Sequence, residues 1–162
     1  MKNIPRETIV VLDNIRSTFN VGSIFRTADA LDISKVIVCG ITPAPKDRFG
    51  RARPDIAKVS LGAEMNVDWE YFEKATWVVK QLKKEGFKII FIEQSDKSVD
   101  YKKIKLSKKD KVAFVLGNEV DGVAKNFLKL ADYVAEIPML GNKESLNVSV
   151  AFGVAAFRIL NI

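Results

Sequence analysis

Three polar segments of this 162-residue chain hold the side chains that could do chemistry, and each follows an apolar run. In the first, residues 14–30, Asn20 and Arg26 are six positions apart. On a helix this spacing is somewhat less than two turns, about 9 Å along the axis. An arginine presented in this way suits a phosphate or a developing oxyanion. The simpler explanation, preferred for this segment alone, is that Asn20 caps a helix and Arg26 is a solvated surface residue.

The second segment, residues 114–123, has the sequence FVLGNEVDGV. Its glycines, Gly117 and Gly122, let the backbone turn sharply or approach a ligand closely. Glu119 is held between them, where a strand is expected to give way to a helix. An ordinary turn with a helix-capping carboxylate would explain the same pattern.

The third segment, residues 137–151, has the sequence IPMLGNKESLNVSVA. Ser145 is the expected N-cap of a final apolar helix. Asn147 then falls inside the first helical turn, where its amide can reach a neighbouring loop or a ligand. Capping together with core packing is the alternative, because the rest of the helix is apolar.

Several kinds of chemistry are excluded by composition. The chain has no histidine, which removes Ser-His-Asp and Cys-His catalysis and the usual zinc sites, and we expect no metal. The single cysteine, Cys39, lies in an apolar run and is expected to be a buried core thiol. Neither GxGxxG nor GxxxxGK[ST] occurs, which argues against a conventional dinucleotide enzyme or P-loop NTPase.

The spacing of apolar residues predicts a single α/β domain with a mostly parallel sheet flanked by helices. The predicted strands are 8–13, 35–39, 87–93, 111–116 and 133–137. The predicted helices are 21–31, 55–61, 69–85, 123–130 and 145–160. Asp68 is expected to cap the 69–85 helix, and Gly86 to stop it. In such sheets ligands bind beyond the carboxyl ends of the strands, where all three polar segments are expected.

The net charge of +6 favours a polyanionic partner such as RNA, although solubility explains the charge equally well. No apolar stretch approaches the roughly 18 residues that span a membrane, and no leader is evident, so we expect a soluble cytoplasmic protein. Basic residues gather in the predicted loop 42–54, at Lys46, Arg48, Arg51 and Arg53. A second Lys-rich stretch, 102–109, is more simply a solvated surface.

Taken together and in this order, the three segments resemble the signature motifs of the SpoU/TrmH RNA 2′-O-ribose methyltransferases of the SPOUT superfamily. The matching parts are Asn20 with 26–30, 116–119 with Gly122, and 137–139 with 145–149. Residues 40–43 and 61–64 also match, so the likeness covers nearly the whole chain. The resemblance implies one methyltransferase domain over residues 1–162 without an N-terminal RNA-binding extension. It also implies a C-terminal trefoil knot, with the knot and cofactor region at about 112–162.

The resemblance further implies S-adenosylmethionine as cofactor, tRNA or rRNA as substrate, and a homodimer whose site borrows residues from both copies. The final helix would serve the core and that interface together, although a fully buried core helix is equally plausible. The implied cofactor-binding residues are Leu116, Gly117, Ile137, Met139, Ser145 and Leu146. The implied RNA-binding residues are Lys46, Arg48, Arg51 and Arg53.

The implied catalytic residues are Arg26, Asn20, Glu119, Ser145 and Asn147. Arg26 would be nearest to the transfer step, as a base or as a group that orients the hydroxyl and stabilises charge. Asn20 would place Arg26 or the ribose, Glu119 and Asn147 would brace the site, and Ser145 would hold the cofactor loop or Arg26.

Three alternatives remain at this point. A catalytically inactive RNA-binding protein on the same fold should have a broken motif, and none of the implied residues is missing. A knotted methyltransferase that acts on a base nitrogen fits the Asn-x5-Arg pattern less well. An unrelated small-molecule α/β enzyme is disfavoured by the missing phosphate loops and histidine.

Overall fold

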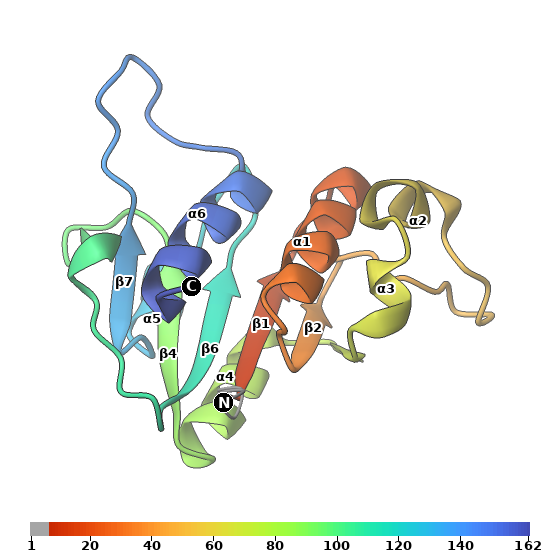
Figure 1. Cartoon of the computed structure of the whole chain (residues 1–162), viewed down its shortest axis with the longest axis horizontal. Helices are drawn as coiled ribbons and strands as arrows, with labels where there is room; N and C mark the ends of the chain where they lie inside the picture. The colour runs from red at the N-terminus through yellow and green to blue at the C-terminus, as the bar shows by residue number, and fades with distance from the viewer. Residues whose placement is uncertain (1–6) are drawn as a thin grey trace.

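The computed structural model describes residues 7–162, and in this part of the chain seven strands form one sheet in which every neighbouring pair is parallel (Figure 1). The strand order is β3-β2-β1-β6-β4-β7-β5. The strands are β1 (Thr8–Asp13), β2 (Lys35–Cys39), β3 (Trp69–Phe72), β4 (Phe87–Ile92), β5 (Val99–Asp100), β6 (Lys111–Leu116) and β7 (Tyr133–Glu136).

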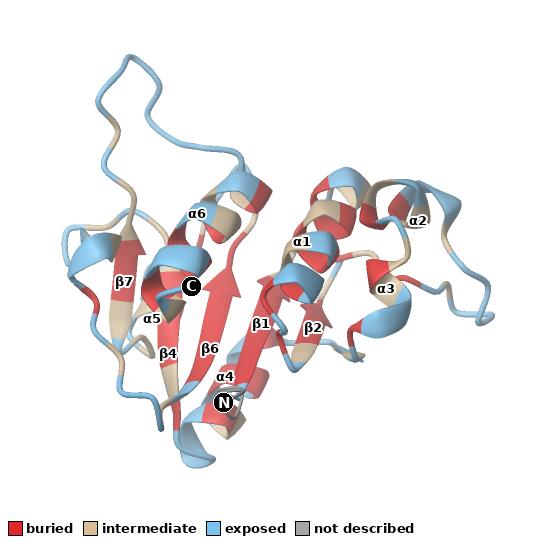
Figure 2. Cartoon of the chain, in the orientation of Figure 1, coloured by how far each residue is buried: buried red, intermediate tan, exposed pale blue. Residues whose placement is uncertain are grey.

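Helices cover both faces of the sheet (Figure 1). They are α1 (Thr18–Ala30), α2 (Pro54–Ser60), α3 (Ala63–Asn66), α4 (Ala75–Lys84), α5 (Lys125–Leu128) and α6 (Val148–Leu160). One buried cluster joins α1, α2, α3 and α6 to the sheet, and a second joins α4 and α5 to its other face. In β1, Val10 faces the first cluster and Val11 the second, as alternation along a strand requires. Burial on both faces explains the unbroken apolar strands (Figure 2).

The carboxyl edge of the sheet gathers the three polar segments. Strands β1, β6 and β7 are parallel members of one sheet, so the segments that follow them start at the same edge. Leu12 near the end of β1 is paired with Leu116 at the end of β6. From β1 the chain first builds β2 and β3 on one side and later β6, β4 and β7 on the other. The strand order therefore reverses at this pair, which is where open α/β sheets bind ligands.

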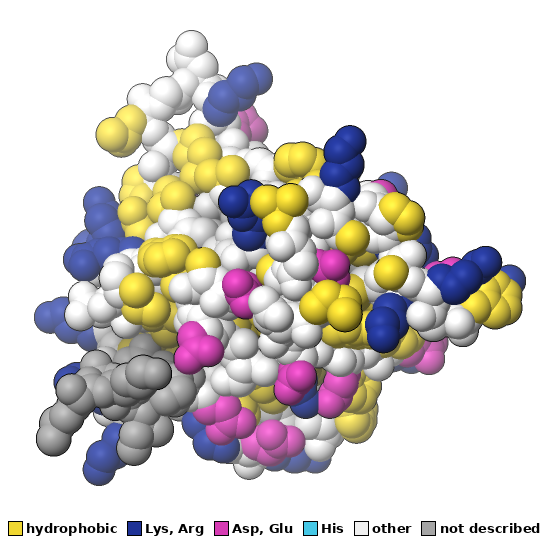
Figure 3. Space-filling view, turned by 45° about the vertical axis from the view of Figure 1, so that its right-hand side comes forward, with side chains coloured by type: hydrophobic (Ala, Val, Ile, Leu, Met, Phe, Trp, Pro, Cys, Tyr) yellow, Lys and Arg dark blue, Asp and Glu magenta, His cyan; other side chains and the backbone are white. Residues whose placement is uncertain are grey.

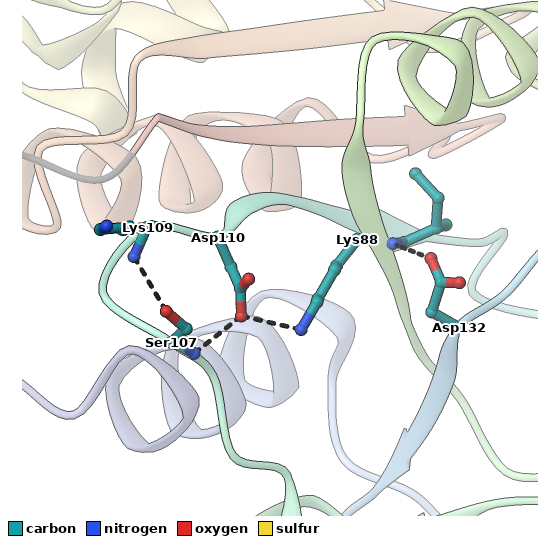
Figure 4. A network of polar contacts seen from close by, with 6 residues as sticks. Lys88, Ser107, Lys109, Asp110 and Asp132 are labelled. Atoms are coloured by element: carbon teal, nitrogen blue, oxygen red, sulfur yellow. Dashed lines mark hydrogen bonds and ion pairs between the residues drawn. The ribbon is translucent and has the colours of Figure 1, made fainter.

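The opposite, amino edge is tied together by its own polar network (Figure 4). Asp110 Oδ2 accepts hydrogen bonds from the Ser107 amide at 2.7 Å and from Lys88 Nζ at 2.8 Å. Asp132 Oδ2 accepts one from the Ile89 amide at 2.8 Å. These contacts fasten the loops that precede β6 and β7 to β4. The Lys-rich stretch 102–109 leads into this edge, away from the three polar segments.

Most predicted elements are confirmed. Strands 8–13, 35–39 and 111–116 have the expected bounds, and Cys39 is buried. The predicted helix 69–85 is wrong in its first part, because Trp69–Phe72 forms β3 and α4 begins only at Ala75. Aromatic residues there favour a strand, and β2 provides a partner for them. The parallel α/β class is confirmed, and the trefoil knot stays a prediction.

Two short elements were not predicted, α3 and β5. Each has at most four residues, which is too short for an apolar period to be recognised. Among residues 7–162, no helix has both the length and the apolar character needed to cross a membrane.

Candidate functional site

Glu119 fastens the turn after β6 to the start of α1. Its Oε1 accepts hydrogen bonds from Asn20 Nδ2 at 3.0 Å and from the Ser17 amide at 3.2 Å. Its Oε2 accepts one from the Arg16 amide at 3.2 Å. The two amides lie at the amino end of α1, where Ser17 is the N-cap. A carboxylate at this place satisfies free helical N–H groups and meets the positive end of the helix dipole.

Asn20 connects this contact to the last helix. Its side chain is 5% exposed, and its Oδ1 accepts a hydrogen bond from Asn147 Nδ2 at 3.0 Å. Asn147 Oδ1 in turn accepts from the amides of Ser149 at 3.0 Å and Val150 at 3.4 Å. We call Glu119, Asn20 and Asn147 the polar junction. It joins one residue from each of the three polar segments, although they are far apart in the sequence.

The junction also keeps Glu119 ionised. Burial acts to raise the pKa of the Glu119 carboxyl, but hydrogen bonds from the Asn20 side chain and from backbone amides outweigh this effect. The pKa therefore lies below its ordinary value. At neutral pH the residue is an anion that holds three donors in place.

Two glycines allow the turn that carries Glu119. A β-carbon on Gly117 would lie 2.4 Å from Val123 Cγ2 and 2.9 Å from the Gly122 carbonyl group. Gly122 itself has a φ of +64°, which favours glycine. Asn118 Nδ2 also donates to the Asn14 carbonyl at 2.9 Å. The glycine pair of the sequence motif is therefore needed for the backbone to close.

A recess of about 340 Å³ lies between the ends of β4, β6 and β7 and the start of α6, and we call it the β6–β7 recess. Five residues of the predicted cofactor set line it: Leu116, Ile137, Met139, Ser145 and Leu146. The sixth, Gly117, is not among the lining residues and is buried between Leu116 and Asn118, which are. Ser145 lies in this wall. The prediction that it caps α6 is wrong. Asn147 is the cap, because its side chain reaches the free amides of the first turn.

Outside the three polar segments, the β6–β7 recess has two polar residues that sequence reasoning missed, Glu93 and Gln94. They directly follow β4, so the rule of polar residues after a strand would have found them. Gln94 Nε2 donates to the Glu144 carbonyl at 2.6 Å, which ties the loop after β4 to the long exposed loop 138–147 (Figure 2).

Arg26 lies in a second, open recess between α1, α2 and α6, which we call the α1–α6 recess. Its side chain is exposed, and Lys58 and Ser149 lie in the same wall. Several large apolar side chains of this recess are also exposed, namely Phe19, Leu61, Val150, Val154 and Phe157. Arg26 is therefore placed beside the polar junction without a hydrogen bond to it.

Gly22 sets the width of the α1–α6 recess. A β-carbon at this position would lie 2.8 Å from Val59 Cβ and 2.9 Å from the Ile56 carbonyl oxygen. The glycine lets α2 lie against α1, which brings Lys58 into the wall that contains Arg26.

The two recesses meet at the start of α6. Ser145 and Leu146 line the first, and Ser149 and Val150 line the second. The first has the size and the mixed lining of a small-molecule pocket. The second has two cationic side chains in its lining, Arg26 and Lys58, which can contact an anionic group bound in that recess. The arrangement can therefore hold a small ligand next to an anionic partner.

Comparisons with known proteins identify the family of this chain. The profile of the SpoU rRNA Methylase family matches residues 7–157. A 23S rRNA (guanosine-2′-O-)-methyltransferase, RlmB, of Neisseria meningitidis is 34% identical over 145 residues, which are 90% of this chain and 54% of that protein.

Solved structures are also similar. An AdoMet-bound rRNA methyltransferase from Sinorhizobium meliloti has a TM-score of 0.83 and 26% identity, and the match covers 99% of this chain and 58% of that one. A TrmH/SpoU tRNA modifying enzyme from A. aeolicus has a TM-score of 0.80 and 26% identity, with 97% and 76% covered. The match to the RlmB relative of the previous paragraph shows that this chain spans about half the length of that protein.

Proposed function

The chain belongs to the SpoU rRNA methylase family, and we propose that it transfers a methyl group from S-adenosylmethionine to a ribose 2′-hydroxyl of tRNA or rRNA. The observation that carries the proposal is the polar junction. It brings the three motif segments together and lies between a pocket for a small ligand and a recess that contains Arg26.

The β6–β7 recess fits S-adenosylmethionine. Leu116, Ile137 and Met139 offer apolar walls for an adenine ring. Three carboxylates, Glu93, Glu119 and Asp121, also line the recess, which suits a ligand with a sulfonium and an ammonium group. When bound there, the cofactor supplies an electrophilic methyl group.

Arg26 would act on the acceptor. An arginine has a pKa above about 12 and is a poor base, so its role is to orient the 2′-hydroxyl and a neighbouring phosphate and to stabilise the developing alkoxide. With the cofactor held in the β6–β7 recess, the 2′-oxygen would gain the methyl group and its proton would pass to water, while S-adenosylhomocysteine would leave with the electron pair of the methyl–sulfur bond. Positioning provides much of the rate enhancement, because the leaving group is already good. The polar junction would keep α1, and hence Arg26, at a fixed distance from the cofactor.

A homodimer is part of the proposal. The exposed apolar side chains around Arg26 form a surface that a second copy would cover, and contiguous apolar surface of this kind is typical of an interface. In the proposed dimer the second copy would cover these apolar side chains and leave Arg26, which is exposed, accessible to RNA at the edge of the interface. Light scattering after size-exclusion chromatography checks this directly. A monomer at all concentrations at which the protein is active would contradict it.

The experiment that tests the function is transfer of labelled methyl from S-adenosylmethionine to total RNA from a strain that lacks the gene. The nucleosides are then identified by mass after nuclease digestion. A 2′-O-methylated nucleoside that is absent with an Arg26→Ala variant supports the proposal and identifies the RNA class. Absence of both transfer and S-adenosylhomocysteine binding would contradict it and favour an RNA-binding protein without catalysis.

A further inference from the structure

The loop between β2 and α2 projects from one end of the molecule (Figure 1). Its tip is closed by an antiparallel bridge between Lys46 and Ala52. Asp47 fixes the tip from inside, because its Oδ1 accepts hydrogen bonds from the amides of Phe49 at 2.8 Å and Arg51 at 3.0 Å. Its Oδ2 pairs with Arg51 Nε at 2.8 Å. A loop with these contacts holds its side chains in a set arrangement.

The tip displays an aromatic ring among cations. The Phe49 side chain is 67% exposed, and the guanidinium carbons of Arg48 and Arg51 lie 4.8 Å and 5.0 Å from its ring centroid. Figure 3 shows a hydrophobic side chain next to basic ones at this protruding end. A single exposed phenylalanine is common and by itself needs no explanation. Here the ring lies beside two cations on a loop held by the hydrogen bonds of Asp47. This combination suits a ligand with both a flat face and a negative charge.

An unpaired nucleotide has both. Proteins that bind single-stranded RNA stack its bases on aromatic rings and arginine planes and neutralise its phosphates with basic side chains. Arg51 is held by Asp47. Among residues 7–162, by contrast, no carboxylate pairs with Arg48. Arg48 is thus free to turn to a phosphate and leave a face of the ring to a base.

Helix α2 also links the loop to the recess that contains Arg26. Helix α2 follows the loop directly, and its Lys58 and Val59 line the α1–α6 recess. The close approach at Gly22 fixes α2 on α1. An RNA strand that places a ribose at Arg26 can therefore continue along α2 to the tip.

We propose that Phe49 stacks on an unpaired base of the bound RNA, near the nucleotide that occupies the α1–α6 recess. The inference rests on the proposed function only in that the partner is RNA. It assigns to the chain a preference for RNA with an exposed base over fully paired RNA, and it adds an aromatic residue to the predicted basic contacts.

The test uses a short RNA hairpin with 2-aminopurine in its loop and a matched duplex in which the same base is paired. Stacking on Phe49 should change the fluorescence of the hairpin. Phe49→Leu should weaken hairpin binding by about 5-fold to 100-fold, abolish that fluorescence change and leave duplex binding unaltered. Phe49→Trp should restore both. Trp77→Leu, which removes an exposed ring from α4 on the other face of the sheet, should behave as wild type.

Unchanged binding by Phe49→Leu, or an equal loss on hairpin and duplex, would overturn the inference, and so would a wild-type protein that binds neither RNA. S-adenosylhomocysteine binding and methyl transfer are measured on the same samples. Stacking on Phe49 in a protein that neither binds S-adenosylhomocysteine nor transfers methyl to total RNA would leave this inference standing and reject the proposed function. Methyl transfer that Phe49→Leu does not change would support the proposed function and reject the inference about Phe49.

Discussion

The polar junction and the α1–α6 recess lie side by side, yet they differ in how complete they are. In the junction, the Asn20 side chain donates to Glu119 and accepts from Asn147, and these contacts all come from one chain. In the recess, Arg26 is exposed and is surrounded by exposed apolar side chains. Folding of one chain therefore provides the hydrogen-bond partners of the junction. The side chains of the recess are exposed, and we expect them to contact a binding partner.

The first polar segment therefore contains two kinds of residue: Asn20 belongs to the junction, and Arg26 belongs to the recess. Changes in the junction should act through the stability of the protein, because its polar groups would lose their partners. Changes in the recess should act through activity, because its groups face no partner that folding provides. The predictions below test this division.

Arg26→Ala should produce the largest effect. Loss of a group that stabilises developing charge lowers turnover by about 100-fold to 1,000-fold, while the free energy of unfolding and the affinity for S-adenosylhomocysteine should stay as in wild type. Single-turnover methyl transfer, urea unfolding and calorimetric titration measure the three quantities. Lys80→Ala, which removes an exposed cation from α4, is the control and should change none of them. Near-normal activity of Arg26→Ala would show that the catalytic assignment is wrong.

Gly22→Ala should affect both regions, but unequally. The new methyl group would lie 2.8 Å from Val59 Cβ, and such overpacking lowers the free energy of unfolding by about 1–3 kcal/mol. Because α2 must shift away from α1, methyl transfer should fall further than cofactor affinity does. Gly141→Ala is the matched control, since a β-carbon there meets nothing within 4 Å. Equal losses in transfer and cofactor affinity would mean that Gly22 does not shape the recess separately.

Glu119→Gln keeps the size of the side chain but replaces one acceptor oxygen with an NH2 group that faces a donor. We expect a loss of about 1 kcal/mol in the free energy of unfolding, below the usual range for hydrogen bonds to charged groups, because Glu119 is exposed and solvent screens its contacts. Urea unfolding measures it, with Glu73→Gln, an exposed carboxylate before α4, as the control. A Glu119→Gln variant that kept its stability and lost only activity would show that Glu119 takes part in catalysis and does not stabilise the junction.

How far the sequence predicts this site depends on what its residues contact. The strands around the site were found because they are long and apolar on both faces. That Asn20, Glu119 and Asn147 belong together came from the resemblance, since hydrogen bonds across about 100 residues leave no local signal. Ser145 was assigned as a helix cap because serine favours that position, but Asn147 competes for the same amides and takes it. The β3 strand was missed because its partner β2, and not its own period, decides its conformation.

The smallest effect should appear in the pH dependence of stability. Since the folded-state pKa of Glu119 lies below the ordinary value of 4.5, its contribution is fully present above pH 4.5 and is lost as the pH falls through the folded pKa. The difference in unfolding free energy between wild type and Glu119→Gln should therefore be constant near neutral pH and shrink in acid. Asp13, whose pKa is raised by burial, is present in both proteins and cancels in the difference. A difference that persists unchanged in acid would mean that the carboxylate charge does not hold the junction together, and that shape alone does.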